Sequence, residues 1–201
     1  MQLLLIRHAL PVPAWASGGP ADPALADDGR TQAARLPGAL APYPIHRIFS
    51  SPQRRALETA APIAADRDLP VEQIVDLAEY DYGLDHYIPL HDARDLAPAA
   101  YERILAGLLP DFVDEDAFRT RVHAGIERVV AGCEHEDTVV VVAHGGVVNI
   151  VLQSILGLAR PLEFPIEYTS VTRVLVSRDG TRRAASINET GHVRDLLRVR
   201  S

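Results

Sequence analysis

Residues 138–156, TVVVVAHGGVVNIVLQSIL, carry the strongest structural signal in the chain. The first six form a continuous apolar run, which is typical of a strand that is buried on both faces. Residues 147–156 are apolar almost all round, which predicts a buried helix with Gly157 as its C-cap. A buried strand that leads through His-Gly-Gly into a buried helix favours an α/β fold with a largely parallel sheet.

The pattern on either side of this stretch supports the same fold. Further strands are predicted at residues 3–6, 47–50, 71–75, 171–177 and 183–187, and helices at 27–36, 52–64, 99–109 and 118–129. Ser51 and Pro52 are predicted as the N-cap and first residue of the second helix, and Pro37 should end or kink the first. A turn at Asp179 and Gly180 should join the last two strands.

We therefore predict one three-layer α/β/α domain over residues 1–201, with a central, mostly parallel sheet. Two halves of about 100 residues each remain an alternative for a chain of this length. Residues 11–23, rich in Pro, Gly and Ala, are expected to form a loop. The least regular segment, around 76–116, is expected to be an insertion that sets substrate specificity.

The composition excludes several classes of protein. Apolar residues make up 47% and charged residues 23%, as in ordinary soluble domains. The net charge is −7 and all 20 basic residues are arginine, so neither nucleic acid nor a membrane surface is an expected partner. The single cysteine, Cys133, excludes an internal disulfide and a multi-cysteine metal site. No apolar run resembles a membrane span or a signal peptide, and we expect a cytoplasmic protein.

Three predicted strands end in cationic or histidine residues. Arg7 and His8 follow the first, Arg54 and Arg55 lie in the helix after the second, and His144 follows the strand at 138–143. Because ligands of open α/β sheets bind at the carboxyl ends of the strands, these side chains should converge. Such a cluster in an acidic protein, beside a Gly-Gly helix start, favours a small anionic ligand such as a phosphate or carboxylate.

Two histidines among arginines permit a sharper hypothesis. A neutral imidazole can attack phosphorus and become phosphohistidine, while arginines and a second histidine stabilise the charge on the phosphoryl oxygens. A general acid must then protonate the leaving oxygen. The carboxylates in the sequence EYDYG, residues 79–83, are the candidates.

These motifs resemble the histidine phosphatase superfamily, which has the phosphoglycerate mutase-like fold. LLLIRHAL at residues 3–10 resembles its arginine–histidine signature, and LADDGRTQAARL at 25–36 the helix after the first loop. SSPQRRALETA at 50–60, LAEYDYG at 77–83 and VVVVAHGGVVNIVL at 139–152 resemble its second, acid and second-histidine motifs. The motifs follow in family order over some three quarters of the chain.

The resemblance implies a role for each matching residue. His8 would be the phosphorylated nucleophile, and Glu79 the proton donor, with Asp81 close by as the other carboxylate. The phosphoryl group would be held by Arg7, Arg55, His144 and Gly145. Arg55 is preferred to Arg54 because it directly precedes the alanine of the motif, and neighbouring helical residues point about 100° apart. The family implies neither a metal nor a cofactor.

Some positions depart from the family pattern. Ala9 replaces the usual glycine after the nucleophile, and Pro11 and Ala14 stand where mutases carry polar residues. Gly146 stands where mutases typically carry asparagine, which favours hydrolysis. We therefore predict a metal-independent histidine acid-type phosphatase, a phosphoric monoester hydrolase acting through phosphohistidine on a small phosphorylated substrate.

Two other functions remain open at this point. One is a phosphoglycerate mutase, and the other is a catalytically silent domain that binds phosphorylated ligands. The identity of the substrate is not set by these motifs, although Trp15, Tyr80, Tyr82 and Tyr87 suggest an aromatic pocket mouth that suits bulky phosphoesters. The sequence does not specify an oligomeric state.

Overall fold

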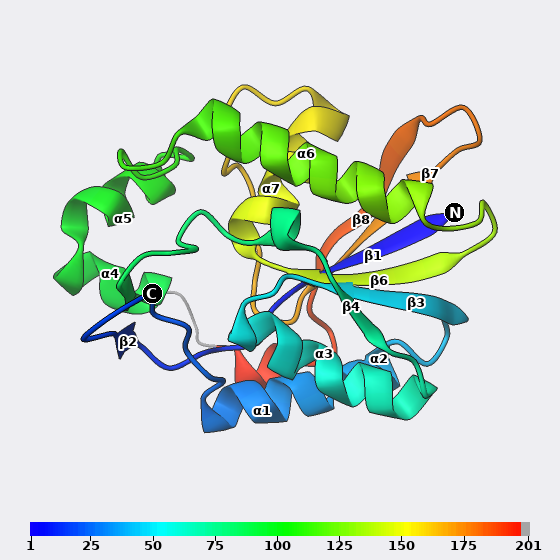
Figure 1. The fold of residues 1–201 in the computed structure, drawn as a ribbon, viewed down its shortest axis with the longest axis horizontal. Helices are drawn as coiled ribbons and strands as arrows, with labels where there is room; N and C mark the ends of the chain where they lie inside the picture. Colours follow the sequence, from blue (N-terminus) through cyan, green and yellow to red (C-terminus); the bar gives the residue numbers. More distant parts are fainter. Residues whose placement is uncertain (198–201) are drawn as a thin grey trace.

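One of the two middle strands of the sheet is β6 (Thr138–Ala143), every residue of which is buried. In the computed structural model, which describes residues 1–197 apart from the side chain of His91, six strands lie in the order β4-β3-β6-β1-β7-β8 (Figure 1). The other five are β1 (Gln2–Arg7), β3 (Ile45–Ser50), β4 (Val71–Gln73), β7 (Val171–Val176) and β8 (Arg182–Glu189). The strands β4, β3, β6 and β1 pair in parallel, and β7 pairs antiparallel with both β1 and β8, so that β7 alone of these six runs in the opposite direction, which confirms a mostly parallel sheet.

Alternating side chains of the buried strands face two different helical layers. In β1, Leu3 and Leu5 pack in a cluster with α6 (Glu115–Ala131) and α7 (Gly145–Leu156). Leu4 and Ile6 pack instead with helices on the opposite face. Those helices are α2 (Leu36–Ala39) and α3 (Arg54–Arg67), with α1 (Asp27–Ala34) beside α3 (Figure 1). The three-layer α/β/α prediction is therefore confirmed.

The irregular segment contains more structure than its sequence indicates. It begins after η1 (Val75–Leu77) and holds β5 (His86–Tyr87), α4 (Leu90–Leu96) and α5 (Pro98–Leu105). The predicted helix at 99–109 is therefore shorter, and α4 was not predicted. The segment at 11–23 is not all loop, because β2 (Ala14–Trp15) pairs with β5. This small sheet ties the N-terminal loop to the irregular segment around 76–116.

Helix boundaries follow local hydrogen bonding. The prediction that α3 starts at Ser51 and Pro52 is wrong, because α3 starts at Arg54 with Gln53 as N-cap. The Ser51 hydroxyl instead contacts His144, 93 residues away. The first helix is interrupted at Arg35, between α1 and α2 and close to Pro37, as predicted. Gly157 ends α7 in a left-handed conformation with φ 65°.

The remaining element is η2 (Arg194–Leu196). Gly180, with φ 83°, lies in the turn between β7 and β8 as predicted. Within residues 1–197, every helix is too short or too polar to cross a membrane.

Candidate active site

The carboxyl ends of four neighbouring parallel strands bring the predicted residues together. His8 follows β1, His144 follows β6, Arg55 lies in the first turn of α3 after β3, and Glu79 follows β4 and η1. The backbone N–H of His8 donates to the Ala143 carbonyl at 2.8 Å, which fixes the end of β1 beside the end of β6. Arg7, the last residue of β1, completes the cluster.

His8 is a buried imidazole with a defined proton position. Its Nδ1 lies 2.7 Å from the Ala9 carbonyl oxygen. Because a carbonyl only accepts, Nδ1 carries the proton and the lone pair resides on Nε2. Burial, together with the charges of Arg55 and Arg7, lowers the pKa of His8 well below its usual value. The ring is therefore neutral near pH 7, with a nitrogen that is able to attack.

The guanidinium groups of the two arginines are held by aromatic rings and by partial pairing. Arg7 donates to the Ile166 carbonyl at 2.6 Å and lies over the Tyr168 ring, 3.9 Å from its centre. Arg55 is only 1% exposed and donates from Nη2 to both carboxylate oxygens of Asp81 at 2.8 Å. Arg7 Nε and Arg55 Nε and Nη1 are buried and have no hydrogen-bond partner within residues 1–197. These groups can still bind an anion.

His144 is fully buried beside the proposed nucleophile. Its ring centre lies 5.1 Å from that of His8, and its Nε2 lies 2.7 Å from the Ser51 hydroxyl. Burial and the neighbouring cations, Arg55 first, lower the pKa of His144 well below its usual value. Its Nδ1 is the fourth buried nitrogen of the cluster without a hydrogen-bond partner in the described part of the chain.

The Glu79 carboxyl group is buried at the N-terminus of α7. Its Oε2 accepts the backbone N–H of Gly146 at 2.8 Å. Burial and, secondarily, the charge of Asp81 raise the pKa of Glu79 to about 7, against the opposing hydrogen bond from Gly146. A carboxyl group with this pKa can both give and take a proton near neutral pH.

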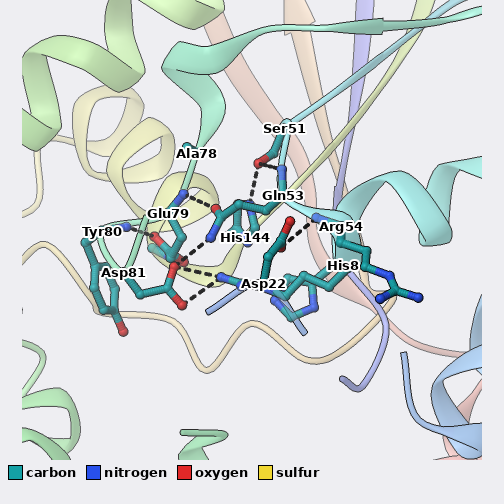
Figure 2. A network of polar contacts seen from close by, with 12 residues as sticks. His8, Asp22, Ser51, Gln53, Arg54, Ala78, Glu79, Tyr80, Asp81 and His144 are labelled. Carbon is teal, nitrogen blue, oxygen red and sulfur yellow. Dashed lines mark hydrogen bonds and ion pairs between the residues drawn. The ribbon is translucent and has the colours of Figure 1, made fainter. Parts of the chain in front are cut away.

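A hydrogen-bond network holds the loop that carries Glu79 (Figure 2). Gln53 accepts the backbone N–H of Glu79 at 2.7 Å and donates its side-chain amide to Asp81 at 2.8 Å. On another side, Arg121 donates to the carbonyls of Ala78 and Glu79. The sequence reasoning missed Ser51, Gln53 and Arg121, although the first two lie inside the second motif.

Arg54 and Asp81, the sequence alternatives to Arg55 and Glu79, have other partners. Arg54 is exposed, donates its backbone N–H to Asp22 and pairs with Glu58 at 2.6 Å. The carboxylate of Asp81 is engaged by Arg55. Arg55, Glu79 and Asp81 line the cavity that contains His8, whereas Arg54 is not among its lining residues; since Asp81 is paired with Arg55, Glu79 is left as the candidate acid.

The cavity has a volume of about 350 Å³. It is lined by Arg7, His8, Arg55, Glu79 and Gly145, together with apolar residues of α4, α5 and the loop around 162–166. Of the aromatic residues expected at the mouth, Tyr80 and Tyr87 line the cavity, whereas Trp15 and Tyr82 are exposed and do not. Among the described residues, no group of three or more His, Cys, Asp and Glu side chains is placed to hold a metal ion.

Comparisons with known proteins place this geometry in a family context. A family model of the histidine phosphatase superfamily (branch 1) matches residues 3–190. The uncharacterized protein Rv0525 of Mycobacterium tuberculosis is 51% identical over 55 residues, and the match spans 27% of each chain. This curated relative is therefore covered over only about a quarter of its length.

Solved structures resemble the chain over almost its whole length. YhfR of Bacillus stearothermophilus is 25% identical with a TM-score of 0.77, and 96% of this chain and 98% of that chain are covered. A mycobacterial glucosyl-3-phosphoglycerate phosphatase is 23% identical with a TM-score of 0.77 and coverages of 94% and 99%. A phosphoserine phosphatase of Entamoeba histolytica is 23% identical with a TM-score of 0.71 and coverages of 96% and 98%. These structures share the fold.

Proposed function

The chain belongs to the histidine phosphatase superfamily (branch 1), and we propose on this basis that it is a metal-independent phosphomonoester hydrolase with a phosphohistidine intermediate on His8. The observation that carries the proposal is a set of four buried nitrogens beside His8 that have no hydrogen-bond partner within residues 1–197. They are Arg7 Nε, Arg55 Nε, Arg55 Nη1 and His144 Nδ1. Buried donors are costly unless they are hydrogen-bonded, and a phosphoryl group offers oxygens to Arg7 and Arg55, which line the cavity, and to His144, which is not among the lining residues but lies beside His8.

The first chemical step is the attack of His8 on phosphorus. The lone pair of Nε2 forms the N–P bond, while the proton on Nδ1 stays there, hydrogen-bonded to the Ala9 carbonyl. The P–O bond to the alcohol breaks, and Glu79 gives its proton to the leaving oxygen. Arg7 and Arg55 stabilise the charge that spreads over the phosphoryl oxygens.

The second step returns the enzyme to its starting state. Glu79, now a carboxylate, takes a proton from a water molecule that attacks the phosphorus of phosphohistidine. The N–P bond breaks, its electron pair returns to Nε2, and inorganic phosphate leaves. A pKa of about 7 suits Glu79 to both transfers, and the depressed pKa of His8 keeps the nucleophile neutral in mildly acidic solution. The latter supports an acid-type phosphatase.

The test is hydrolysis of p-nitrophenyl phosphate between about pH 5 and pH 8, with and without EDTA. We expect EDTA-resistant activity in the parent protein and none in His8→Ala, whose circular dichroism should be unchanged. When the reaction with a ³²P-labelled substrate is quenched shortly after mixing, the parent protein should carry a radioactive phosphoryl group that is labile in acid and stable in base. His8→Ala should carry none. Unchanged activity in His8→Ala would overturn the proposal.

The adjacent arginines provide a matched pair of variants. Arg55→Lys should lose activity because lysine cannot reproduce the pairing with Asp81 and the contact with phosphate together. Arg54→Ala should keep the parent rate, since Arg54 is exposed and pairs with Glu58. Two other results would favour the alternative functions. Isomerisation of 3-phosphoglycerate faster than phosphate release would indicate a mutase, and tight phosphate binding without turnover a silent binding domain.

A further inference from the structure

The phosphate-binding groups occupy only part of the cavity that contains His8. Most of the remaining lining consists of apolar side chains from three segments that meet opposite the strand ends. They include Leu84 and Ile88 before α4, Ile104 and Leu105 on α5, Phe112 after it, and Phe164 before β7. In Figure 1, α4 and α5 lie beyond the carboxyl ends of the parallel strands, on the side where the active site is. A volume of about 350 Å³ exceeds the need of a phosphate group alone.

The outer wall of the cavity is apolar up to the solvent. Leu105 and Phe112 both line the cavity, yet they are 64% and 57% exposed. Leu96, on α4 and close in sequence to lining residues, is 54% exposed. Large apolar side chains that gather around a cavity opening mark a binding surface more often than isolated exposed ones do. The route to His8 therefore favours an apolar group.

The charges along the cavity disfavour a second anionic group on the substrate. Its arginines are Arg7 and Arg55, and the latter is already paired with Asp81. Glu163, an acidic residue, also lines the cavity. His86 also lines the cavity, and its Nδ1 lies 2.8 Å from a carboxylate oxygen of Asp85. Beyond the phosphoryl group, a carboxylate or a second phosphate would face mainly apolar side chains, together with Glu163 and a histidine that already lies against Asp85.

From these three observations, and resting on the phosphatase function proposed above, we propose that the substrate is the phosphomonoester of a bulky, uncharged, apolar alcohol. The phosphoryl group binds at His8, and the hydrocarbon part of the leaving alcohol lies against α4, α5 and Phe164. Hydrolysis breaks the P–O bond to this alcohol, which takes a proton from Glu79, and water supplies the fourth oxygen of inorganic phosphate. The apolar lining selects the substrate by burial of its hydrocarbon.

The experiment compares primary alkyl phosphates, because their alcohols have nearly equal acidity and differ only in the hydrocarbon. We expect kcat/KM to rise from ethyl to butyl to octyl phosphate, by about fourfold for each methylene that enters the cavity. Octyl phosphate, used below its micellar concentration, should exceed 3-phosphoglycerate and phosphoserine at least tenfold. An equal kcat/KM for ethyl and octyl phosphate, or a preference for either anionic substrate, would overturn the inference.

A matched pair of variants on α5 locates the effect. Ala100 lines the cavity, whereas its neighbour Ala99 is exposed and is not among the lining residues. Ala100→Phe fills the cavity and should lower kcat/KM for octyl phosphate at least tenfold, with a change of less than threefold for ethyl phosphate. Ala99→Phe should leave both values unchanged. Equal losses for the two substrates in Ala100→Phe would contradict the assigned position of the hydrocarbon.

Binding of phosphonates separates this inference from the catalytic proposal. Octylphosphonate and ethylphosphonate carry the same anionic head group and cannot be hydrolysed, so calorimetry measures their affinities even if no phosphate ester turns over. We expect octylphosphonate to bind at least tenfold more tightly, and Ala100→Phe to abolish the difference. Turnover without this preference would refute the substrate class alone, and the preference without turnover would refute the catalytic proposal alone.

Discussion

The Glu79 carboxylate accepts the backbone N–H of Gly146 at 2.8 Å, and this hydrogen bond joins the loop that carries Glu79 to the N-terminus of α7. This contact requires the absence of a side chain at position 146. A Cβ atom there would overlap Glu79 Oε1 and lie 3.0 Å from its carboxyl carbon. Gly146, which distinguishes this chain from the mutase pattern, is thus required for the observed position of the Glu79 carboxylate.

Gly146→Ala should lower kcat without unfolding the protein. The obstructed group is the end of a flexible side chain, so the Glu79 carboxylate should move aside and lose its alignment with the leaving oxygen. We expect a loss of about 10- to 100-fold with ethyl phosphate. Gly145→Ala is the matched comparison, because its Cβ would meet Arg7 Nε at an ordinary contact distance of 3.6 Å. A larger loss in Gly145→Ala than in Gly146→Ala would contradict this explanation.

Glu79→Gln should change both the leaving-group dependence and the pH profile. Loss of the general acid should lower kcat for ethyl phosphate by about 10²- to 10⁴-fold, and less for p-nitrophenyl phosphate, whose phenolate leaves without a proton. In the parent, burial raises the pKa of Glu79 to about 7, so kcat/KM should fall as the pH rises through about 7 and the proton is lost. The variant should lack this alkaline limb. A limb that persists in Glu79→Gln would assign it to another group.

The same pKa has a consequence for stability. A folded-state pKa above the usual 4.5 means that the folded protein binds this proton more tightly than the unfolded chain does. The contribution of Glu79 to the free energy of unfolding is therefore present below about pH 4.5 and is lost as the pH rises through about 7. Urea denaturation across this range should show a smaller decline in Glu79→Gln than in the parent. Parallel pH dependences would contradict the raised pKa.

The elements that the sequence predicted best are those with a long local signal. The apolar run at 138–143 predicted the bounds of β6, because a strand buried along its whole length requires consecutive apolar residues. Gly157 predicted the end of α7, because a left-handed C-cap favours glycine. The seven-residue α4 and the two-residue strands β2 and β5 have no such signal. The positions of β2 and β5 depend on pairing between segments about 70 residues apart.

A similar division applies to the site. Motif order and strand ends led to the five residues that the structure brings together, since Arg7 ends β1 and each of the other four follows a parallel strand of the sheet. The prediction that a helix starts at Ser51 is wrong, because the Ser51 hydroxyl contacts His144 and does not cap α3. Gln53 was missed because its role requires knowledge of contacts 26 and 28 residues away. Long-range polar contacts of this kind have no periodicity in the sequence.

Asp81→Asn should shift the alkaline limb to lower pH. The charge of Asp81 raises the pKa of Glu79, and its removal also leaves the Arg55 cation uncompensated, which lowers that pKa further. Both effects have the same sign. Because Arg55 is buried, we also expect a loss of about 3 kcal/mol in the free energy of unfolding. The measurements are the pH dependence of kcat/KM and urea denaturation, and an alkaline limb at higher pH than in the parent would refute the assignment.

Ser51→Ala should weaken phosphate binding through the tautomer of His144. The Ser51 hydroxyl accepts the Gln53 backbone N–H at 3.3 Å and can donate its own proton to His144 Nε2 at 2.7 Å. This arrangement leaves the proton of the neutral ring on Nδ1, the nitrogen without a partner in residues 1–197. Without the hydroxyl, the proton can move to Nε2, and one donor to the phosphoryl group is lost.

We therefore expect Ser51→Ala to lower kcat/KM and the affinity for inorganic phosphate by about tenfold each. Ser50→Ala is the matched control, because the buried Ser50 hydroxyl donates to the Ser51 carbonyl, its one side-chain hydrogen bond within residues 1–197, and should be dispensable for activity. Nitrogen-15 chemical shifts of His144 should report protonation at Nδ1 in the parent and Ser50→Ala, and at Nε2 in Ser51→Ala. The same tautomer in all three proteins, or an equal loss of affinity in Ser50→Ala, would show that Ser51 acts only through the fold.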